Sequence, residues 1–137
     1  MSQESVDLYR QILEAGNLPE REALAALAPL LAPDFHTHNA ATAVTDKSYY
    51  GLAGTVEWRN DLTEGFAERA RFEVEAIIAE SNEFVVGRWA LIGTGARSGA
   101  PLHLRWISVV WFGGGKATHA VGYSTRNEAL KAVGLED

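Results

Sequence analysis

Apolar residues recur at helical spacing in three segments of the first half of the chain. Residues 5–15, 19–33 and 51–66 each predict a helix with one apolar face. Pro19 opens the second helix at a tolerated first-turn position, and Pro29 kinks or shortens it. The residues of these faces are Val6, Tyr9, Ile12 and Leu13, then Leu24, Leu27, Leu30 and Leu31, then Leu52, Val56, Leu62 and Phe66.

The pattern changes to a period of two in the second half of the chain. Phe72, Val74 and Ala76 alternate with charged neighbours, which predicts a strand with one solvated face. A short strand, a polar loop to residue 50 and a last helix at 127–133 complete the set. Helices followed by a run of strands predict an α+β fold with an antiparallel sheet. The other predicted strands are residues 35–39, 84–94, 102–112 and 116–125.

The last predicted hairpin allows its register to be estimated. Residues 113–115 are all glycine, and a three-residue loop that ends in glycine suits a type I turn followed by a bulge. This register makes Ser108 face Ala120 and Trp106 face Gly122. Large groups on one strand then lie beside very small ones on its neighbour, which leaves room for a pocket.

The opposite face of the same two strands is too apolar to be only a solvated surface. A contiguous apolar surface on a soluble domain indicates a partner. We therefore expect a homodimer that packs through this face. Its residues include Arg105, Ile107, Trp111, His119, Val121 and Tyr123.

Composition narrows the possible partners and environments. The net charge of −6 argues against nucleic acid and against an anionic membrane surface, both of which demand a basic face. The chain has no cysteine, so disulfides and thiolate chemistry are excluded. It lacks a membrane-spanning apolar run, and its first residues lack the basic and apolar features of a signal peptide. These features favour a cytoplasmic protein.

Several segments carry, in their order and spacing, a resemblance to a known family. They are residues 9–17, 30–39, 51–66, 72–74, 111–116 and 127–135. Together they resemble the SnoaL-like branch of the nuclear transport factor 2-like superfamily over residues 1–137 as one domain. The resemblance implies a cone-shaped (cystatin-like roll) fold: a curved antiparallel sheet wraps around the N-terminal helices, with a pocket between them and a dimer as the usual assembly.

Relatives in this branch include polyketide cyclases, ketosteroid isomerases, limonene epoxide hydrolases and members without known activity. The catalytic relatives use carboxylates whose pKa is raised in an apolar pocket. By the resemblance, Tyr9 stands at the position of the oxyanion-hole tyrosine. Asn39, Ser108 and Gly122 stand where such relatives carry aspartates. An amide cannot take up a proton at neutral pH, so the carboxylate mechanism is not expected here.

Two histidines near the first predicted strand are the remaining candidates for proton transfer. His36 and His38 are two apart on a strand and therefore point to one side. They could begin a metal site, or His38 could act as a base, since the unperturbed pKa of histidine suits that role. The simpler interpretation is two partly exposed histidines at a sheet edge. We expect no metal and no cofactor.

These observations leave one preferred function and two alternatives. The preferred function is a pocket that binds a small apolar or aromatic molecule without catalysis. The first alternative is an enzyme of cyclase, isomerase or hydrolase type that uses Tyr9 as donor and His38 as base. The second is a structural dimer whose core is filled, with Trp106 in the place of the pocket. The predicted pocket residues are Tyr9, His38, Asn39, Trp58, Trp106, Ser108, Ala120 and Gly122.

Overall fold

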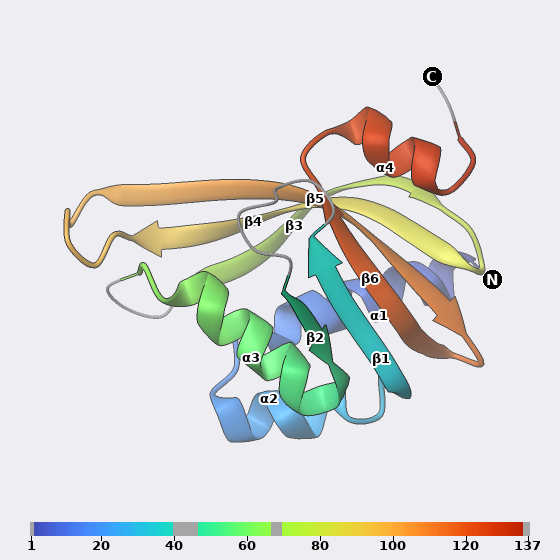
Figure 1. Cartoon of the computed structure of the whole chain (residues 1–137), viewed down its shortest axis with the longest axis horizontal. Helices are drawn as coiled ribbons and strands as arrows, with labels where there is room; N and C mark the ends of the chain where they lie inside the picture. The colour runs from blue at the N-terminus through green and yellow to red at the C-terminus, as the bar shows by residue number, and fades with distance from the viewer. Residues whose placement is uncertain (1, 40–46, 67–69, 136–137) are drawn as a thin grey trace.

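The computed structural model describes residues 2–39, 47–66 and 70–135, and its elements are labelled in Figure 1. The helices are α1 (Ser2–Ala15), α2 (Glu20–Leu27), α3 (Gly51–Thr63) and α4 (Arg126–Ala132). The strands are β1 (Leu31–Asn39), β2 (Ser48–Tyr50), β3 (Arg71–Glu80), β4 (Phe84–Thr94), β5 (Pro101–Gly113) and β6 (Lys116–Tyr123).

The predicted helical segments form helices, but the second is shorter than predicted. On α1, the side chains of Val6, Tyr9 and Leu13 are buried, as their spacing on one helical face requires. Helix α2 ends at Leu27, two residues before Pro29, so the predicted shortening is confirmed. The extension of this helix to residue 33 is wrong, because Leu31 instead begins strand β1.

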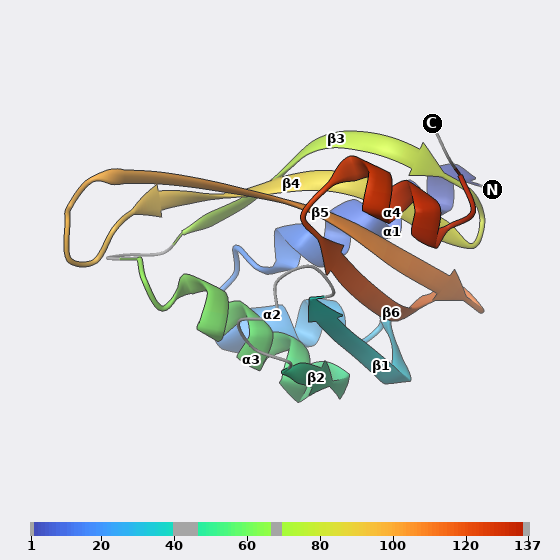
Figure 2. The same ribbon diagram turned by 45° about the horizontal axis from the view of Figure 1, so that its top comes forward.

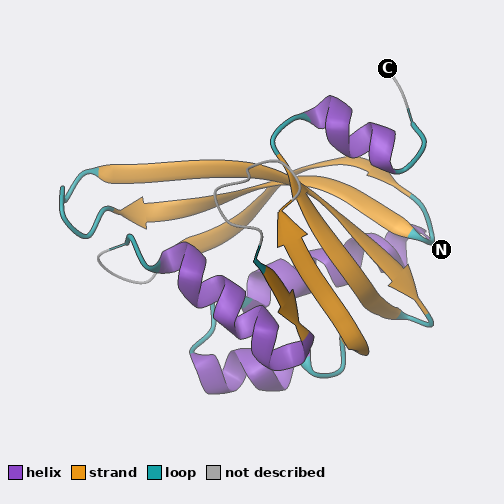
Figure 3. Cartoon of the chain, viewed as in Figure 1, coloured by secondary structure: helices purple, strands orange, loops and turns teal. Residues whose placement is uncertain are grey.

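Six strands form one curved, open sheet in the order β2-β1-β6-β5-β4-β3 (Figure 3). The predicted α+β fold is confirmed, and the strands from β3 to β6 form the predicted antiparallel meander. Two features were not predicted. Strand β2 pairs with β1 inside the segment taken as a loop, and β1 runs parallel to β6. The local sequence of β1 does not indicate that the strand runs parallel to β6, because β6 lies far along the chain.

The β5–β6 hairpin has a different register from the predicted one. Gly114 and Gly115 both have positive φ, 62° and 79°, which gives a two-residue turn that closes on Gly113 and Lys116. A bulge follows on β6, and beyond it Ser108 pairs with Gly122. The predicted pairs of Ser108 with Ala120 and of Trp106 with Gly122 are therefore wrong by two residues.

This shift changes the pairs but leaves the two faces of the hairpin as predicted. A displacement by two residues keeps every side chain on its original face, because side chains on a strand alternate with a period of two. Val110 now pairs with Ala120, and Trp111 pairs with His119. The small residues Ala120 and Gly122 therefore still lie on the same face as Ser108.

The helices lie on both sides of the sheet (Figures 1 and 2). Helices α1, α2 and α3 pack against the inner, concave face, where most of the buried apolar residues gather. Helix α4 lies on the outer face. The hydroxyl of Thr125 caps α4 by accepting a hydrogen bond from the Glu128 backbone N–H at 3.2 Å. Within the described part of the chain, no helix is long and apolar enough to cross a membrane.

Helix α4 covers part of the outer face that the sequence assigned to a partner. Its Ala129 is fully buried with Val86 and Val109 of the sheet. Ile107, Trp111 and Tyr123 of the predicted dimer face pack against the same cluster, each half-buried. The face is thus covered in part from within the chain, and the homodimer stays a prediction.

Candidate functional site

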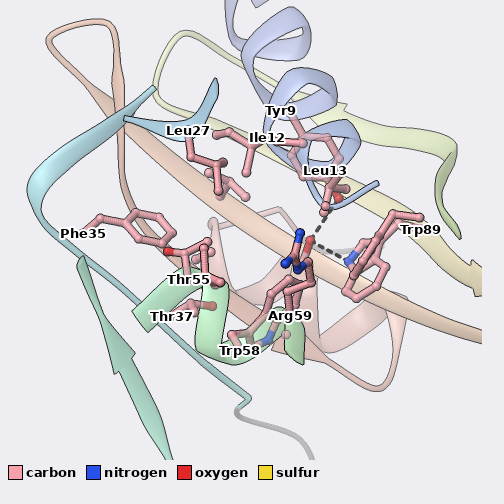
Figure 4. Close-up of a pocket in the computed structure, with 18 of the residues that line it drawn as sticks. Tyr9, Ile12, Leu13, Leu27, Phe35, Thr37, Thr55, Trp58, Arg59 and Trp89 are labelled. Carbon is pink, nitrogen blue, oxygen red and sulfur yellow. Dashed lines mark hydrogen bonds between the residues drawn. The ribbon is translucent and has the colours of Figure 1, made fainter. Parts of the chain in front are cut away.

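A cavity of about 70 Å³ lies between the inner face of the sheet and helices α1, α2 and α3 (Figure 4). Its wall is mainly apolar, and the polar groups in it are few. Leu13, Leu27, Phe35 and Val110 are among its aliphatic and aromatic lining residues. Such a wall favours an apolar occupant, because water in it finds few hydrogen-bond partners.

Three buried side chains form a hydrogen-bonded chain in the cavity wall. The Tyr9 hydroxyl and the Ser108 Oγ are 2.9 Å apart, and the Trp89 indole Nε1–H donates to the same Ser108 Oγ at 3.2 Å. Figure 4 shows both bonds as dashed lines. The three residues come from α1, β5 and β4, so the fold brings them together from distant parts of the chain. We call them the Tyr9–Ser108–Trp89 triad.

The triad has one more hydrogen than it uses. Its donors are the indole N–H and the two hydroxyl groups, which supply three hydrogens. Two hydrogen bonds hold the triad together, and two of the three hydrogens make them. Within the described residues the two hydroxyls make no further hydrogen bond, so the remaining hydrogen, on Tyr9 or on Ser108, is left for an acceptor in the cavity that both residues line. The site can therefore donate one hydrogen bond to a bound oxygen atom.

Burial keeps Tyr9 in its protonated form. The side chain has no exposed surface, and this desolvation raises the pKa of its phenol far above the ordinary value, although the Ser108 hydroxyl acts in the opposite direction. A phenolate at this position would lie in an apolar wall. Tyr9 therefore serves as a hydrogen-bond donor at neutral pH and not as a base.

Gly87 leaves the space that Tyr9 occupies. A Cβ built on Gly87 would lie 2.5 Å from the Tyr9 hydroxyl oxygen and 2.6 Å from its ring carbon Cζ. Strand β4 is flanked by β3 and β5, so its backbone cannot move away easily. Position 87 therefore requires glycine, because the Tyr9 ring packs directly against its backbone.

Aromatic rings occupy much of the space between α3 and the sheet. Trp89 stacks on Trp106 with ring centroids 4.9 Å apart, and it meets Trp58 edge-on at 5.6 Å. Phe72 contacts both Trp58 and Trp89. The cavity is what these rings leave, so Trp106 narrows it without filling it. The structural dimer with a filled core stays an alternative prediction, because the space left is only about 70 Å³.

The cavity is small. Its volume of about 70 Å³ is below the ~150 Å³ of an engineered cavity that holds benzene. A flat polycyclic molecule does not fit without movement of the lining side chains. A compact molecule, or one end of a larger one, matches the space better.

The structure brings six of the eight predicted pocket residues to the cavity wall. They are Tyr9, Trp58, Trp106, Ser108, Ala120 and Gly122. The prediction that His38 lines the pocket is wrong. Phe35 and Thr37 of β1 line the cavity, and alternation along the strand directs His36 and His38 to the outer face. Asn39 ends β1 beside Gly122, but its side chain lies outside the described residues.

His36 belongs instead to a row of rings across the outer face. It stacks on His119 at 5.2 Å, and His119 stacks on Trp111 at 4.3 Å. Tyr50, which is 70% exposed, continues the row at 6.2 Å from His36. Burial lowers the pKa of His119, and the charges of His36 and His38 act in the same direction. Among the described residues, no cluster of three histidine, aspartate or glutamate side chains could hold a metal ion.

Sequence reasoning missed several lining residues, and Trp89 and Arg59 are the two that matter most for the chemistry of the site. Trp89 lies in a strand that is buried on both faces, so no alternation indicated the side to which it points. Arg59 lines the cavity from α3 next to Trp58. Its spacing carries a signal, because Arg59 lies three residues after Val56 and therefore on the same helical face.

The model of the SnoaL-like domain family matches residues 7–120. The chain belongs to the SnoaL-like domain family. The resemblance stated from the sequence is thereby confirmed. A search among proteins of curated function finds no match.

Solved structures share the fold of this SnoaL-like domain. A proposed polyketide cyclase from Streptomyces antibioticus is 19% identical, with a TM-score of 0.70 over 96% of this chain and 99% of that one. A proposed SnoaL-like polyketide cyclase from Jannaschia sp. CCS1 is 16% identical, with a TM-score of 0.69 over 96% and 90%. A protein of ketosteroid isomerase-like fold from Catenulispora acidiphila, solved with trimethylamine, is 16% identical, with a TM-score of 0.67 over 94% and 93%. At these identities the likeness concerns the fold.

Proposed function

We propose that this SnoaL-like domain binds a small, mainly apolar molecule that carries one hydrogen-bond-accepting oxygen. The molecule would lie in the cavity between the sheet and helices α1, α2 and α3. The observation that carries the proposal is the unused hydroxyl hydrogen of the Tyr9–Ser108–Trp89 triad in an otherwise apolar wall. A carbonyl oxygen would accept this hydrogen, and the body of the molecule would contact the tryptophan rings.

The size of the cavity limits the ligand class. Two of the structural neighbours are described as proposed polyketide cyclases, and a polycyclic ligand would follow by analogy with them. The space of about 70 Å³ instead favours a compact ketone, or the inner end of a longer molecule. Trp58 is half-buried and lies at the helix side of the cavity, so its movement is the simplest way to admit a larger ring.

The enzyme alternative has less support. General base catalysis needs a group that takes up a proton near neutral pH within reach of the ligand. His38 lies on the other face of the sheet, and the described lining residues include no aspartate, glutamate or histidine. Tyr9 could polarise a bound carbonyl, but polarisation without a base does not complete an isomerase or cyclase reaction. Binding without proton transfer is therefore the function we prefer.

The homodimer and the cytoplasmic location remain predictions from the sequence. A dimer would use the part of the outer face that α4 leaves open. The ring row runs from Trp111, which packs against the cluster under α4, to the exposed Tyr50, and its Tyr50 end would contact the partner.

A thermal-shift series tests the proposed function. Cyclopentanone, cyclohexanone and acetophenone are compared with cyclopentane, cyclohexane and ethylbenzene, which lack the carbonyl oxygen. A ligand at a hundred times its dissociation constant adds ~2.7 kcal/mol, which raises the melting temperature by about 5–15 °C. We expect at least one ketone to give such a rise and its hydrocarbon counterpart to give a smaller one.

Two alanine-to-leucine variants complete this test. Ala120→Leu adds a side chain inside the cavity and is expected to abolish the rise. Ala132→Leu makes the same change at an exposed position of α4, on the other side of the sheet, and is expected to retain it. No rise with any compound, or an equal rise in Ala120→Leu, would contradict the proposed function.

A further inference from the structure

One charged residue lies where the inner cavity meets a second, more open cleft. The cleft is lined by Leu18, Pro19, Asn60, Thr63 and Ala70, and it shares Arg59 and Gly16 with the inner cavity. Arg59 is the only charged residue among the described lining residues of both spaces. Figure 4 shows its side chain among those that line the cavity.

The Arg59 guanidinium is positioned by neutral groups. One terminal nitrogen, Nη1, donates to the Leu18 backbone carbonyl at 2.7 Å. The other, Nη2, donates to the Asn60 side-chain oxygen over a long 3.4 Å. A guanidinium has five N–H groups in a planar fork, so further donors remain available. These two contacts orient the guanidinium and leave three of its five N–H groups for other acceptors.

Within the described residues, no carboxylate lies within 4.0 Å of the Arg59 guanidinium, whereas five other basic side chains have such partners. The Arg59 side chain is half-buried. A cation that is partly removed from water and lacks a counter-ion gains from an anion that reaches it. A carboxylate is the natural anion, because it accepts two parallel hydrogen bonds from the guanidinium fork.

We propose that Arg59 binds the carboxylate of an amphipathic ligand at the mouth of the cavity, with the ligand's apolar body inside. This inference rests on the proposed function and defines its ligand class as small apolar oxo acids, whose carbonyl oxygen accepts the hydrogen of the triad while the carboxylate reaches Arg59. The carboxylate lies at the boundary with the outer cleft, where solvent still reaches it. The apolar body enters the space that the tryptophan rings leave.

The negative net charge of the protein cannot explain a preference for anionic ligands. The chain carries a net charge of −6, which disfavours anions at long range. A preference for an anionic ligand over a neutral one of the same shape must therefore come from a nearby cation. Arg59 is the charged group of the described lining that can supply it.

Matched acid and amide ligands test the proposal. 3-Oxocyclopentanecarboxylate and its amide, and 4-oxopentanoate and its amide, are titrated into the whole chain at pH 7.5, where the acids are ionised. Dissociation constants are measured from the shifts of the backbone and tryptophan indole N–H signals by NMR. We expect the acid of at least one pair to bind about tenfold or more tightly than its amide, as a charge-assisted pair requires.

Three variants identify the residue responsible. Arg59→Gln removes the charge and keeps an N–H donor for the Leu18 carbonyl, and it is expected to bring the acid down to the affinity of the amide. Arg59→Lys keeps the charge without the fork and is expected to retain part of the preference. Arg21→Gln makes the same change of charge at an exposed position of α2 outside both linings, and it is expected to bind like the wild type. Melting temperatures verify that each variant is folded.

The outcomes separate this inference from the proposed function. Acid and amide that bind equally, with shifts at the cavity tryptophans and no change in Arg59→Gln, would overturn the role of Arg59 and leave the proposed function intact. An acid preference that is lost equally in Arg21→Gln would also overturn it, because the effect would then come from overall charge. Shifts confined to the outer face would contradict the proposed function itself.

Discussion

Replacing Gly87 by alanine is expected to destabilise the fold by about 3 kcal/mol or more. The new Cβ would lie 2.5 Å from the Tyr9 hydroxyl oxygen, which no relaxed structure tolerates. Tyr9 has no exposed surface, so its ring must leave a fully packed position. Its bond with Ser108 would be lost at the same time. Urea unfolding followed by circular dichroism measures the change in the free energy of unfolding.

Gly113→Ala is the matched control for this prediction. Gly113 lies at the end of β5, and a Cβ there would meet the Thr118 methyl group at 3.4 Å, an ordinary contact. Its backbone has no positive φ, so alanine is tolerated. We expect a change within about 0.5 kcal/mol for this variant. Equal losses in the two variants would show that the Tyr9 contact is not the cause.

Replacing Ser108 by alanine is expected to cost more than replacing Tyr9 by phenylalanine. Without the Ser108 hydroxyl, both the Trp89 indole N–H and the Tyr9 hydroxyl lose their partner in a buried site. Each unsatisfied buried group costs about 1–3 kcal/mol. Tyr9→Phe removes one hydroxyl and leaves Ser108 to accept from Trp89, so its expected cost is about 1 kcal/mol. Urea unfolding of both single variants measures the difference.

The double variant refines this second prediction. If Tyr9 and Ser108 act through their shared hydrogen bond, the two losses will not add, because either change removes that bond. Additive losses would contradict a direct bond between them. A larger loss in Tyr9→Phe than in Ser108→Ala would contradict the central place of Ser108 in the triad.

The faces of the β5–β6 hairpin could be predicted from the sequence, whereas its register could not. The three glycines indicated a turn, and the period of two then fixed which residues share a face. The turn type was not encoded in the same way, since Gly113 could equally extend the strand. The bulge on β6 compensated for the shorter loop, so Ser108, Ala120 and Gly122 reached the cavity despite the wrong pairs.

The direction of His38 depended on a contact far along the chain. Alternation showed that His36 and His38 share one side of β1. Which side faces the helices is decided by the pairing of β1 with β6, a parallel contact between distant segments. The position of Arg59 between the inner cavity and the outer cleft depends in the same way on the packing of α3 against the turn after α1. Local patterns do not contain such information.

The cavity beside the Tyr9–Ser108–Trp89 triad is the proposed binding site. The four tryptophans provide the most direct measurement of it, because three of them line the cavity and Trp111 lies on the outer face against His119. The indole N–H signals are followed by proton–nitrogen NMR while the ketone that gave the largest thermal shift is added. We expect the signals of Trp58, Trp89 and Trp106 to move and that of Trp111 to stay unchanged. A shift of Trp111 alone would contradict this expectation.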